Sequence, residues 1–306
     1  MKKLLCRIIL MKAYSNDFIK QLPLRIYIFL NKKYFILSKK IHCLAIPQKK
    51  LNIIFSKKDG WEKDLRNGFK GLPHKLTFAE LNITDITKYD LVVPLTIEDV
   101  LYLDTVRHLI NQQSFHIPSK EVVHLCNDKY LFAQNLIKNG FDDYIPKING
   151  DKKYPFFLKK KIDTWSQNTH LISNWTQEQD FFQQIHSEDY YRQEAVIGAD
   201  EYATHIVFDK KILHSLTIKH HYKRHNRFPI QGEEKAFKNI VKCKHLELFS
   251  NILKNIGYQG LCCIDYKMKD NSPMIFEINP RFGGSLTQFF FSFVVAETEL
   301  RSLPSI

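Results

Sequence analysis

The feature that most constrains the fold lies near the C-terminus, where two alternating segments flank a short polar cluster. The segments are LCCIDYKM at 261–268 and MIFEIN at 274–279, and DNSP stands between them. Alternation of apolar and polar residues predicts strands, and an Asp-Asn-Ser-Pro cluster favours a turn. The sequence therefore predicts an antiparallel hairpin.

The register of this hairpin brings acidic residues together. If the turn is centred on residues 271 and 272, paired residues have numbers that sum to about 542 or 543, and Asp265 lies nearly opposite Glu277. Glu277 shares its face with Asn279 and, in the 542 register, with Cys263 and Asp265. Facing carboxylates repel each other, and a hard divalent cation is the usual compensation. We expect Asp265, Glu277 and Asn279 to bind magnesium, although a hydrated solvent-facing sheet explains the same pattern.

The sequence that follows the acidic strand favours the metal site. EINPRFGGS at 277–285 places Arg281 and then Gly283 and Gly284 directly after the strand. An arginine and a flexible glycine pair can hold anionic groups beside a metal ion.

The rest of the chain reads as two kinds of architecture. From about residue 51, apolar runs alternate with helical patterns, which is typical of an α/β unit with a parallel sheet; residues 24–30 offer a further strand. The back half is rich in hairpins. We expect a helix that begins near Asn127 or Asp128 with Asn127 as its cap, and a long helix from Phe237 to Ile256 that ends at Gly257. Strands are expected at 155–161, near 190–196, and at 201–209 and 211–218.

The segment GYQGLCCIDYKMKDNSPMIFEINPRFGGS at 257–285 resembles the C-terminal metal-binding signature of ATP-grasp enzymes. Within them it is most similar to the carbamoyl-phosphate-synthase-like and carboxylate-amine ligase branch. The resemblance implies an α/β N-terminal pre-ATP-grasp domain followed by an α+β ATP-grasp fold, which consists of a central lid and a C-terminal antiparallel-sheet domain. We place these parts at 1–120, 121–190 and 191–306.

The resemblance also implies ligands and site residues. ATP and Mg²⁺, with Mn²⁺ as the alternative ion, would be the cofactors, and Asp265, Glu277 and Asn279 would hold the metal. The remaining implied roles are phosphate binding by Lys129 and Lys159, adenine binding by Glu194 and the backbone of Ala195, Val196 and Ile197, ribose binding by Glu201, and phosphate or acyl-phosphate contacts by Lys219 and Arg281. Apart from the resemblance, the cation-dense stretch HHYKRHNR at 220–227 precedes Pro229, and we expect it to form a mobile loop near the active site that either binds an acidic substrate or is solvated. His221 and Tyr222 of this stretch are candidates to accept a proton from the amine. The loop KKKIDTWSQNTHL after the second lysine lacks the glycines that many family members carry; Ser166, Gln167, Asn168 and Thr169 could donate hydrogen bonds in their place.

The activity that the resemblance implies is ligation. A substrate carboxylate attacks the γ-phosphate of ATP to give an acyl phosphate, and an amine then displaces phosphate to form an amide or peptide-like bond. The substrates would be a small-molecule carboxylate and an amine. Two other readings are open: an ATP-grasp phosphotransferase or a nucleotide-binding protein without ligation, and an anion- or nucleic-acid-binding protein that uses residues 1–58.

The charge distribution is the reason for this last alternative. The formal net charge is +13, and residues 1–58 hold 14 Lys and Arg against one acid, whereas the remaining residues hold 31 of each sign. The block predicts either an anionic partner or a solvated lysine-rich face. The six cysteines show no zinc-ligand spacing, no apolar run approaches the roughly 20 residues of a membrane-spanning helix, and no secretory signal is predicted, so we expect a cytoplasmic protein. An oligomer is compatible with the sequence.

Overall fold

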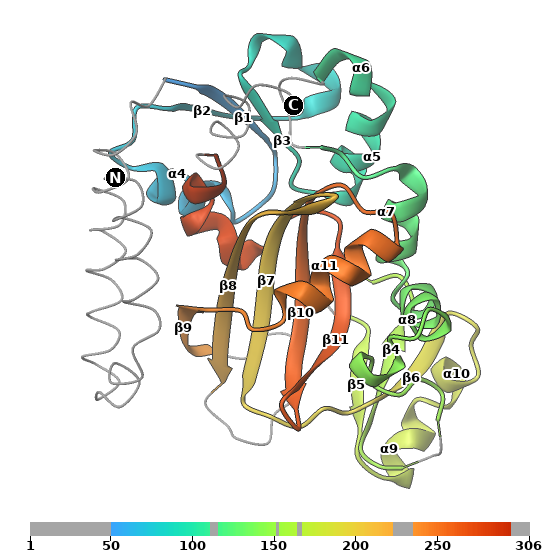
Figure 1. Cartoon of the computed structure of the whole chain (residues 1–306). Coiled ribbons are helices and arrows are strands. Elements are labelled where there is room, and N and C mark those ends of the chain that lie inside the picture. The colour runs from blue at the N-terminus through green and yellow to red at the C-terminus, as the bar shows by residue number, and fades with distance from the viewer. Residues whose placement is uncertain (1–49, 111–115, 151–152, 164–166, 223–234, 295–306) are drawn as a thin grey trace, which may run out of the picture.

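The computed structural model describes residues 50–110, 116–150, 153–163, 167–222 and 235–294. The expected strand at 24–30 and all of the basic block before residue 50 lie outside these ranges. Three sheets organise the described chain; in Figure 1 the first lies above the third, and the second lies at the lower right. Within the described residues, no helix is both long and apolar enough to span a membrane.

The first sheet is a small parallel sheet with the strand order β2-β1-β3. Its strands are β1 (Asn52–Ser56), β2 (Lys75–Ala79) and β3 (Leu91–Val93), and its helical segments are α4 (Glu62–Phe69), η1 (Leu81–Ile83), η2 (Ile86–Lys88), α5 (Ile97–Thr105) and α6 (Arg107–Ile110). Ile53, Ile54 and Phe55 are all fully buried because both faces of β1 are covered. The predicted α/β unit is confirmed, whereas the half-exposed edge strand β2 was not predicted.

The second sheet is antiparallel, with the order β5-β4-β6. Its elements are β4 (Phe156–Lys160), β5 (Thr169–Ile172), β6 (Tyr190–Glu194), α9 (Trp175–Asp180) and α10 (Phe182–Ile185). The two helices cover the face that carries Phe156 and Leu158. Alternation turns Lys159 to the other face, where its Nζ lies 5.1 Å from the ring centre of Phe276 in the third sheet. The second sheet therefore turns the Lys159 face toward the third.

The third sheet is the largest and is antiparallel, with the order β11-β10-β7-β8-β9. Its strands are β7 (Asp200–Asp209), β8 (Lys211–Tyr222), β9 (Lys235–Val241), β10 (Gly260–Lys269) and β11 (Ser272–Asn279). One face packs against α11 (Leu246–Asn255) and α8 (Lys129–Lys138) through a cluster that includes Phe132, Phe249 and Ile264. Figure 1 shows α11 lying across this face. The helices leave the opposite face available for polar residues.

The predicted long helix is wrong in its first half. Residues 235–241 form β9, which pairs with β8, and only α11 is helical, with Gly257 at its end in the left-handed region at φ 66°. Phe237, Ile240 and Val241 fit the spacing of a helix and also occur in a strand. Pairing with the edge of β8 satisfies the backbone of this segment, and the local pattern does not reveal that partner.

The connection into the second sheet also differs from the prediction in one detail. Asn127 ends α7 (Lys120–Asn127), and the cap of α8 is Asp128, whose carboxylate accepts hydrogen bonds from the backbone of Tyr130 and Leu131 at 3.0 and 2.9 Å. A short 3₁₀ turn, η3 (Asp142–Tyr144), follows α8. Both α7 and α8 pack against β11, while β6 belongs to the second sheet. The domain boundaries near 120 and 190 stay a prediction.

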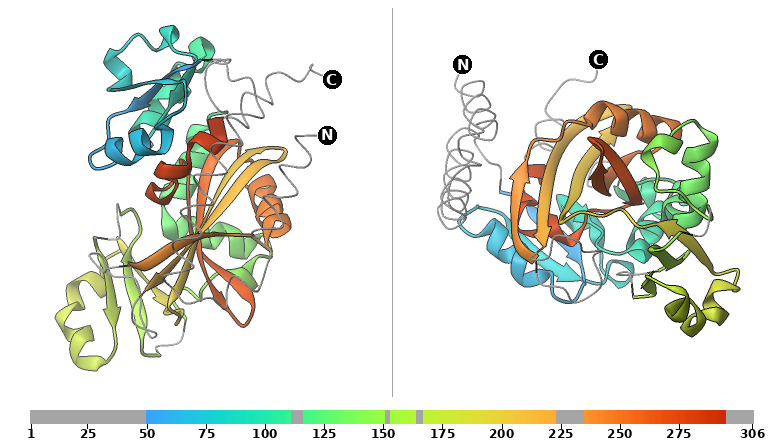
Figure 2. Two further views of the ribbon diagram at one scale, coloured as in Figure 1. Left: turned by 90° about the vertical axis from the view of Figure 1, so that its left-hand side faces the viewer. Right: turned by 90° about the horizontal axis from the view of Figure 1, so that it is seen from below.

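The first sheet docks onto the segment that follows β11. This segment begins with η4 (Gly284–Phe289), and its Phe290 ring lies 5.4 Å from that of Phe55 in β1. The ring of Trp61, just before α4, lies 5.3 Å from that of Phe282 and is tilted against it by 40°. A Cβ atom on Gly68 would lie 2.8 Å from a backbone oxygen, so α4 and η4 approach at a position that only glycine fits. Figure 2 shows the first sheet seated on this end of the molecule.

Candidate active site

The predicted hairpin is formed by β10 and β11, and its register at the site is the expected one. Asp265 pairs with Glu277 and Cys263 pairs with Asn279, so their side chains share one face of the third sheet. Residues 270–271 make the turn with φ of 50° and 65°, as in a type I′ turn. The predicted pairing of Asp265 with Glu277 is confirmed. The turn lies one residue earlier than expected, so the pairs next to it sum to 541, and a bulge after Asp265 restores the 542 register at the site.

The three oxygen-bearing side chains lie within hydrogen-bonding distance of one another. Nδ2 of Asn279 donates to Oδ2 of Asp265 at 3.0 Å and to Oε1 of Glu277 at 2.9 Å. Half a turn of the amide would put its oxygen in place of its nitrogen, and the group would then offer three oxygens to one cation. This donor set suits magnesium or manganese. Within the described ranges, no cluster of three His, Cys, Asp or Glu side chains offers another metal site.

Lys129 connects this group to the second sheet. It is the first residue of α8, is only 8% exposed, and donates from Nζ to the backbone oxygen of Asp163 at 2.7 Å. The same Nζ lies 3.4 Å from Oε2 of Glu277. Burial acts to raise the pKa of Glu277, but Lys129, the Asn279 amide and Lys159 together lower it. Glu277 is therefore held as a carboxylate.

Lys159 approaches the site from the other side, on β4. Its Nζ lies 5.6 Å from the ring centre of Phe157 and 5.1 Å from that of Phe276. Burial lowers the pKa of Lys159 to about 8, while Glu277 acts in the opposite direction. A lysine in this position can give up its proton near neutral pH and gains from any anion that enters.

A cleft of about 260 Å³ opens beside these groups. Its lining comes from β10, β11 and the segment after β11, from the helices α5, α7 and α8, and from the loops after β1 and β4: Lys58, Trp61, Ile97, Cys126, Asn127, Lys129, Asp163, Asp265, Glu277, Asn279, Pro280, Arg281, Gly283 and Gly284. The metal-binding candidates, Lys129 and Arg281 are thus brought to one cavity. Neither Lys159 nor Lys219 is part of its lining.

Two residues from the loop after β1 belong to the cleft and were not predicted from the sequence. Lys58 and Trp61 lie in the loop after β1, at the carboxyl end of a parallel strand, which is where ligands bind in open α/β sheets. This rule is the signal from which the sequence could have indicated these two residues. Arg281 lies over the same indole ring, with Cζ 5.6 Å from its centre, and donates from one terminal nitrogen to the oxygen of Phe282 at 2.9 Å.

His205 supports the glycine pair at the cleft wall. Its Nδ1 accepts from the backbone N–H of Gly283 at 3.3 Å, and its Nε2 lies 2.9 Å from Oγ of Ser285. Burial lowers the pKa of His205 to about 3, so the ring is neutral and can accept this bond. A Cβ atom on Gly283 would lie 3.1 Å from Sγ of Cys263, which leaves little room for a larger residue.

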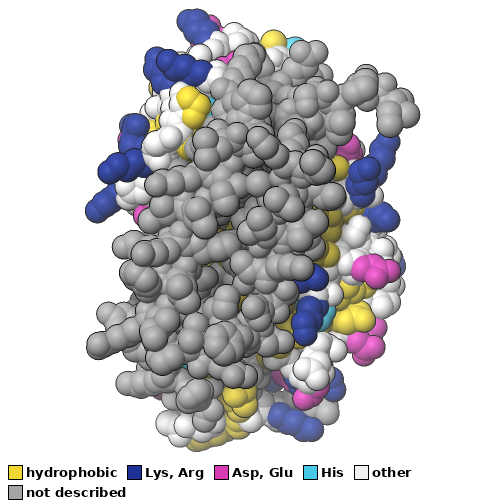
Figure 3. All heavy atoms as spheres, turned by 60° about the vertical axis from the view of Figure 1, so that its left-hand side comes forward, with side chains coloured by type: hydrophobic (Ala, Val, Ile, Leu, Met, Phe, Trp, Pro, Cys, Tyr) yellow, Lys and Arg dark blue, Asp and Glu magenta, His cyan; other side chains and the backbone are white. Residues whose placement is uncertain are grey.

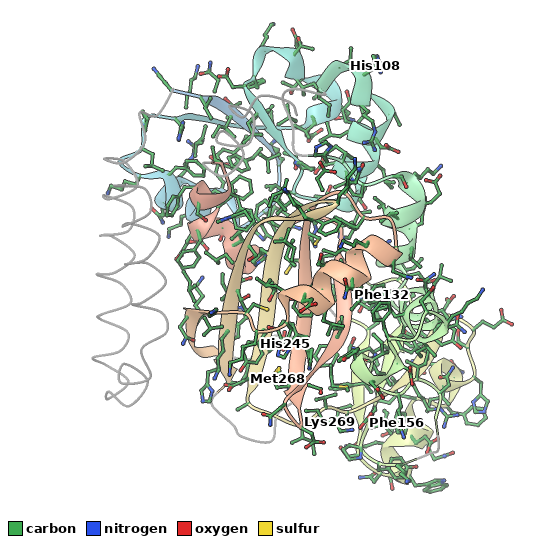
Figure 4. The ribbon with its side chains drawn as sticks, in the orientation of Figure 1. His108, Phe132, Phe156, His245, Met268 and Lys269 are labelled. Carbon is green, nitrogen blue, oxygen red and sulfur yellow. The ribbon has the colours of Figure 1, made fainter. Side chains whose placement is uncertain are left out.

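The first two of the four residues assigned to adenine lie at a second cavity, of about 350 Å³, at the hinge between β6 and β7. Glu194 and Ala195 line it, and Oε1 of Glu194 accepts from Lys269 Nζ at 2.5 Å. Figure 4 labels Lys269 and Phe156, which line this cavity from the β10–β11 turn and from β4. The side chain of Val196 is buried and that of Ile197 is 60% exposed.

Glu201 and Lys219 lie on opposite faces of the third sheet. Glu201 faces the site side and accepts from the hydroxyl of Tyr222 at 3.3 Å. Lys219 lies on the side that α11 covers, over the ring of Tyr202, and forms an ion pair with Asp200. We therefore no longer assign a catalytic role to Lys219, because the sheet separates it from the cleft.

The residues next to Lys219 on β8 include His221 and Tyr222, which were expected to accept a proton from the amine. His220, and not Lys219, pairs with Glu201 on the site face. His221 is engaged with Asp200, its Nδ1 being 2.6 Å from Oδ1. Residues 223–234, which include most of the expected cationic loop, lie outside the described residues.

The loop after β4 is stabilised by hydrogen bonds between its own residues. Asn168 donates from its backbone and from Nδ2 to the carboxylate of Asp163, at 2.9 and 3.1 Å. These bonds fix the carbonyl group of Asp163 that Lys129 uses. Of the four residues expected to donate to phosphates, Ser166 lies outside the described ranges, and Asn168 is engaged within the loop.

Comparison with protein families identifies the class. A family model described as "ATP-grasp domain" matches residues 126–285, more than half of the chain. The chain belongs to the ATP-grasp family, as the resemblance predicted. No curated protein sequence matches it.

Solved structures share the fold. The D-alanine–D-alanine ligase of Bacillus anthracis is 12% identical with a TM-score of 0.54, over 83% of this chain and 99% of that one. The phosphoribosylamine–glycine ligase of Thermotoga maritima is 15% identical with a TM-score of 0.63, over 81% and 75%. The L-amino acid ligase of Bacillus licheniformis is 12% identical with a TM-score of 0.54, over 80% and 70%. The predicted ATP-grasp fold is confirmed.

Proposed function

We propose that this chain is an ATP- and divalent-metal-dependent ligase that joins a small carboxylate to an amine. The observation that carries the proposal is the meeting of Asp265, Glu277 and Asn279 with Lys129 at one end of a cleft that Arg281 also lines. The ligases with the same fold support it. ATP is the phosphate donor that the family assignment favours, and magnesium is the ion that the oxygen donor set fits.

The residues of the cleft act by position and charge. Asp265, Glu277 and Asn279 would hold the metal, which when bound supplies neutralisation of the phosphate oxygens. Lys129 and Lys159 approach the same point from α8 and β4 and would bind the triphosphate. Phosphoryl transfer depends on such positioning more than on covalent help from the protein.

The hinge cavity is our candidate for the base of ATP. Glu194 would accept from the adenine amino group, and the backbone of Ala195, Val196 and Ile197 would pair with the ring edge. Lys269 already holds the Glu194 carboxylate in place. Glu201, on the site face of β7, would accept from the ribose hydroxyls.

The reaction then has two steps. An oxygen of the substrate carboxylate bonds to the γ-phosphorus of ATP and ADP leaves, which gives an acyl phosphate. The amine nitrogen bonds to the acyl carbon, phosphate leaves, and the nitrogen gives up a proton. Arg281, whose buried Nε has no hydrogen-bond partner among the described residues, is placed to bind the acyl phosphate.

The test uses hydroxylamine as a general amine, because it converts any acyl phosphate to a hydroxamate. The purified full-length protein is incubated with ATP, magnesium and a panel of carboxylic acids, and ADP and hydroxamate are measured. We expect both products in equal amounts with at least one acid, and neither product with the Glu277→Gln variant.

The matched control is Glu247→Gln, which removes an exposed acid on α11 and should behave as wild type. ADP release without hydroxamate for every acid would overturn ligation and favour a phosphotransferase. If no ADP forms and the protein binds nucleic acid equally well with and without the Glu277→Gln substitution, nucleic-acid binding by residues 1–58 is favoured instead. Figure 3 shows Lys and Arg side chains of the described residues spread around one face with Asp and Glu among them.

A further inference from the structure

The end of the cleft that the first sheet builds carries positive charge that the proposed binding of ATP does not use. Lys58 follows β1, and its Nζ donates to the backbone oxygen of Leu95 at 2.9 Å while lying 4.0 Å from the ring centre of Trp61. Arg281 lies over the same ring at 5.6 Å. Lys58 and Arg281 therefore both lie against one indole ring, and each is within reach of the other's charge.

The positive charges of Lys58 and Arg281 repel each other. Burial and, after it, the charge of Arg281 lower the pKa of Lys58 to about 8, although Asp99 and Glu98 act in the opposite direction. A buried Nε of Arg281 also has no acceptor among the described residues. Bound anionic oxygens would relieve the repulsion and supply the acceptor.

The acids that line the cleft gather at its other end. Lys129 contacts the backbone of Asp163 and the carboxylate of Glu277, and Asp265 is tied to Asn279. The first sheet contributes only cationic and apolar lining: Lys58, Trp61 and Ile97. Among the described lining residues, none at this end offers a carboxylate to a substrate ammonium group.

We propose that Lys58 binds a second anionic group of the acid substrate, so that the enzyme activates a dicarboxylate or a comparable doubly charged acid. One carboxylate would lie at Arg281, where it is phosphorylated, and the other at Lys58. The carbon chain between them would pack on the Trp61 ring, which Gly284 and Phe282 contact. This inference rests on the proposed function, because it names the substrate class of the same site.

The first experiment compares matched acids in the hydroxamate assay. Succinate and glutarate should be far better substrates than butyrate and valerate, which differ only by the second carboxylate. Lys58→Met should raise KM for the dicarboxylate by about 10- to 100-fold, as expected for one charge-assisted hydrogen bond, and leave kcat within about 3-fold. It should not change the weak reaction of the monocarboxylate. Lys58→Arg should restore part of the loss, and Lys57→Met, at an exposed neighbouring lysine, is the control.

A second measurement needs no catalysis. Trp61 is one of three tryptophans, and binding of an anion by Lys58 would alter its fluorescence. Titration of the nucleotide-free protein with glutarate should change the emission, valerate should not, and the change should be absent from Lys58→Met and from Trp61→Phe.

The two proposals fail in different ways. If monocarboxylates and dicarboxylates give hydroxamate equally well, or if Lys58→Met leaves their ratio unchanged, the anion subsite is wrong and the ligase stands. If no acid gives hydroxamate, the ligase is wrong, and the fluorescence titration alone decides about the subsite: a glutarate signal that Lys58→Met retains, or no signal in wild type, overturns it.

Discussion

The two faces of the third sheet are built from the same strands and have opposite chemistry. On β10, Cys262, Ile264 and Tyr266 pack into the apolar cluster beneath α11. The alternate residues Cys263 and Asp265 face the cleft side. Because successive side chains of a strand point to opposite faces, the same strand supplies core residues on one face and site residues on the other. The comparison predicts that substitutions on the two faces of one strand pair have separable effects.

The largest effect is expected on the cleft face. Glu277→Gln removes a metal-binding oxygen and a charge partner of Lys129, so turnover should fall by about 100- to 1,000-fold. The free energy of unfolding should fall by less than about 2 kcal/mol, because one hydrogen-bonded ion pair is weakened. Enzyme assay and urea unfolding of the same preparation measure both. Unfolding at the assay temperature would contradict the separation of the faces.

The next effect is expected on the helix face. Ile264 is fully buried in the apolar cluster, and Ile264→Ala should lower the free energy of unfolding by about 2–5 kcal/mol. Activity of the folded fraction should be near wild type. The control is Ile162→Ala, at a side chain 57% exposed, which should change stability by less than about 0.5 kcal/mol. Equal loss of stability in both variants would break the comparison.

A smaller effect is expected where the cleft face meets the glycine pair. Gly283→Ala would crowd Sγ of Cys263 and the ring of His205, and the displacement should reduce turnover by roughly 10-fold. Removal of the sulfur in the double variant Cys263→Ala, Gly283→Ala should recover part of the activity. If the double variant is no better than the single one, crowding against Cys263 is not the cause.

The smallest effect is a pH dependence. The pKa of Lys159 is lowered from 10.5 to about 8, so in the free protein its ammonium group is lost as pH rises through about 8. ATP affinity should therefore fall several-fold between pH 7 and 9, and calorimetric titration measures it. Lys159→Arg keeps its charge and should abolish this slope. A slope that persists in the arginine variant would assign the titration to another group.

The sequence predicts the cleft face of the hairpin well because the information there is local. Alternation and a nearby turn narrow the partner of Asp265 to Glu277 or a neighbour of it. The turn alone would pair residues whose numbers sum to 541, as Lys269 and Ser272 do, and the bulge beside Asp265 raises the sum to the predicted 542. The same reasoning places Lys129 at the start of a helix, although the cap is Asp128 rather than Asn127. The residues that hold the site together are thus close to a turn or a cap.

Lys219 shows how a single irregularity defeats this reasoning. A regular hairpin about Lys210 pairs residues whose numbers sum to 420, as Asp209 and Lys211 do, and would put Lys219 opposite Glu201. A bulge between Val207 and Phe208 raises the sum to 421, so His220 takes that position. One inserted residue turns every later side chain to the other face. The sequence contains no clear signal for the bulge.

Lys58 and Trp61 were missed for a different reason. Their place in the cleft depends on how the first sheet docks on the segment after β11, through Phe55, Phe282 and Phe290. Contacts between parts that are more than 200 residues apart leave no periodic trace. The wrong first half of the helix predicted over 237–256 has the same origin, because β9 exists only as the partner of β8.

The Trp61 indole packs against Gly284, and this contact matters for protein engineering. A Cβ atom at position 284 would lie 3.1 Å from the indole, so these two sites fit each other as a matched pair although the chain supplies them from opposite ends. Recombinants that exchange the leading segment between homologous enzymes would therefore need to carry both sides of this junction together. Libraries with a crossover between positions 61 and 284 should yield folded proteins in which Trp61 and Gly284 no longer match and this part of the cleft lining is incomplete.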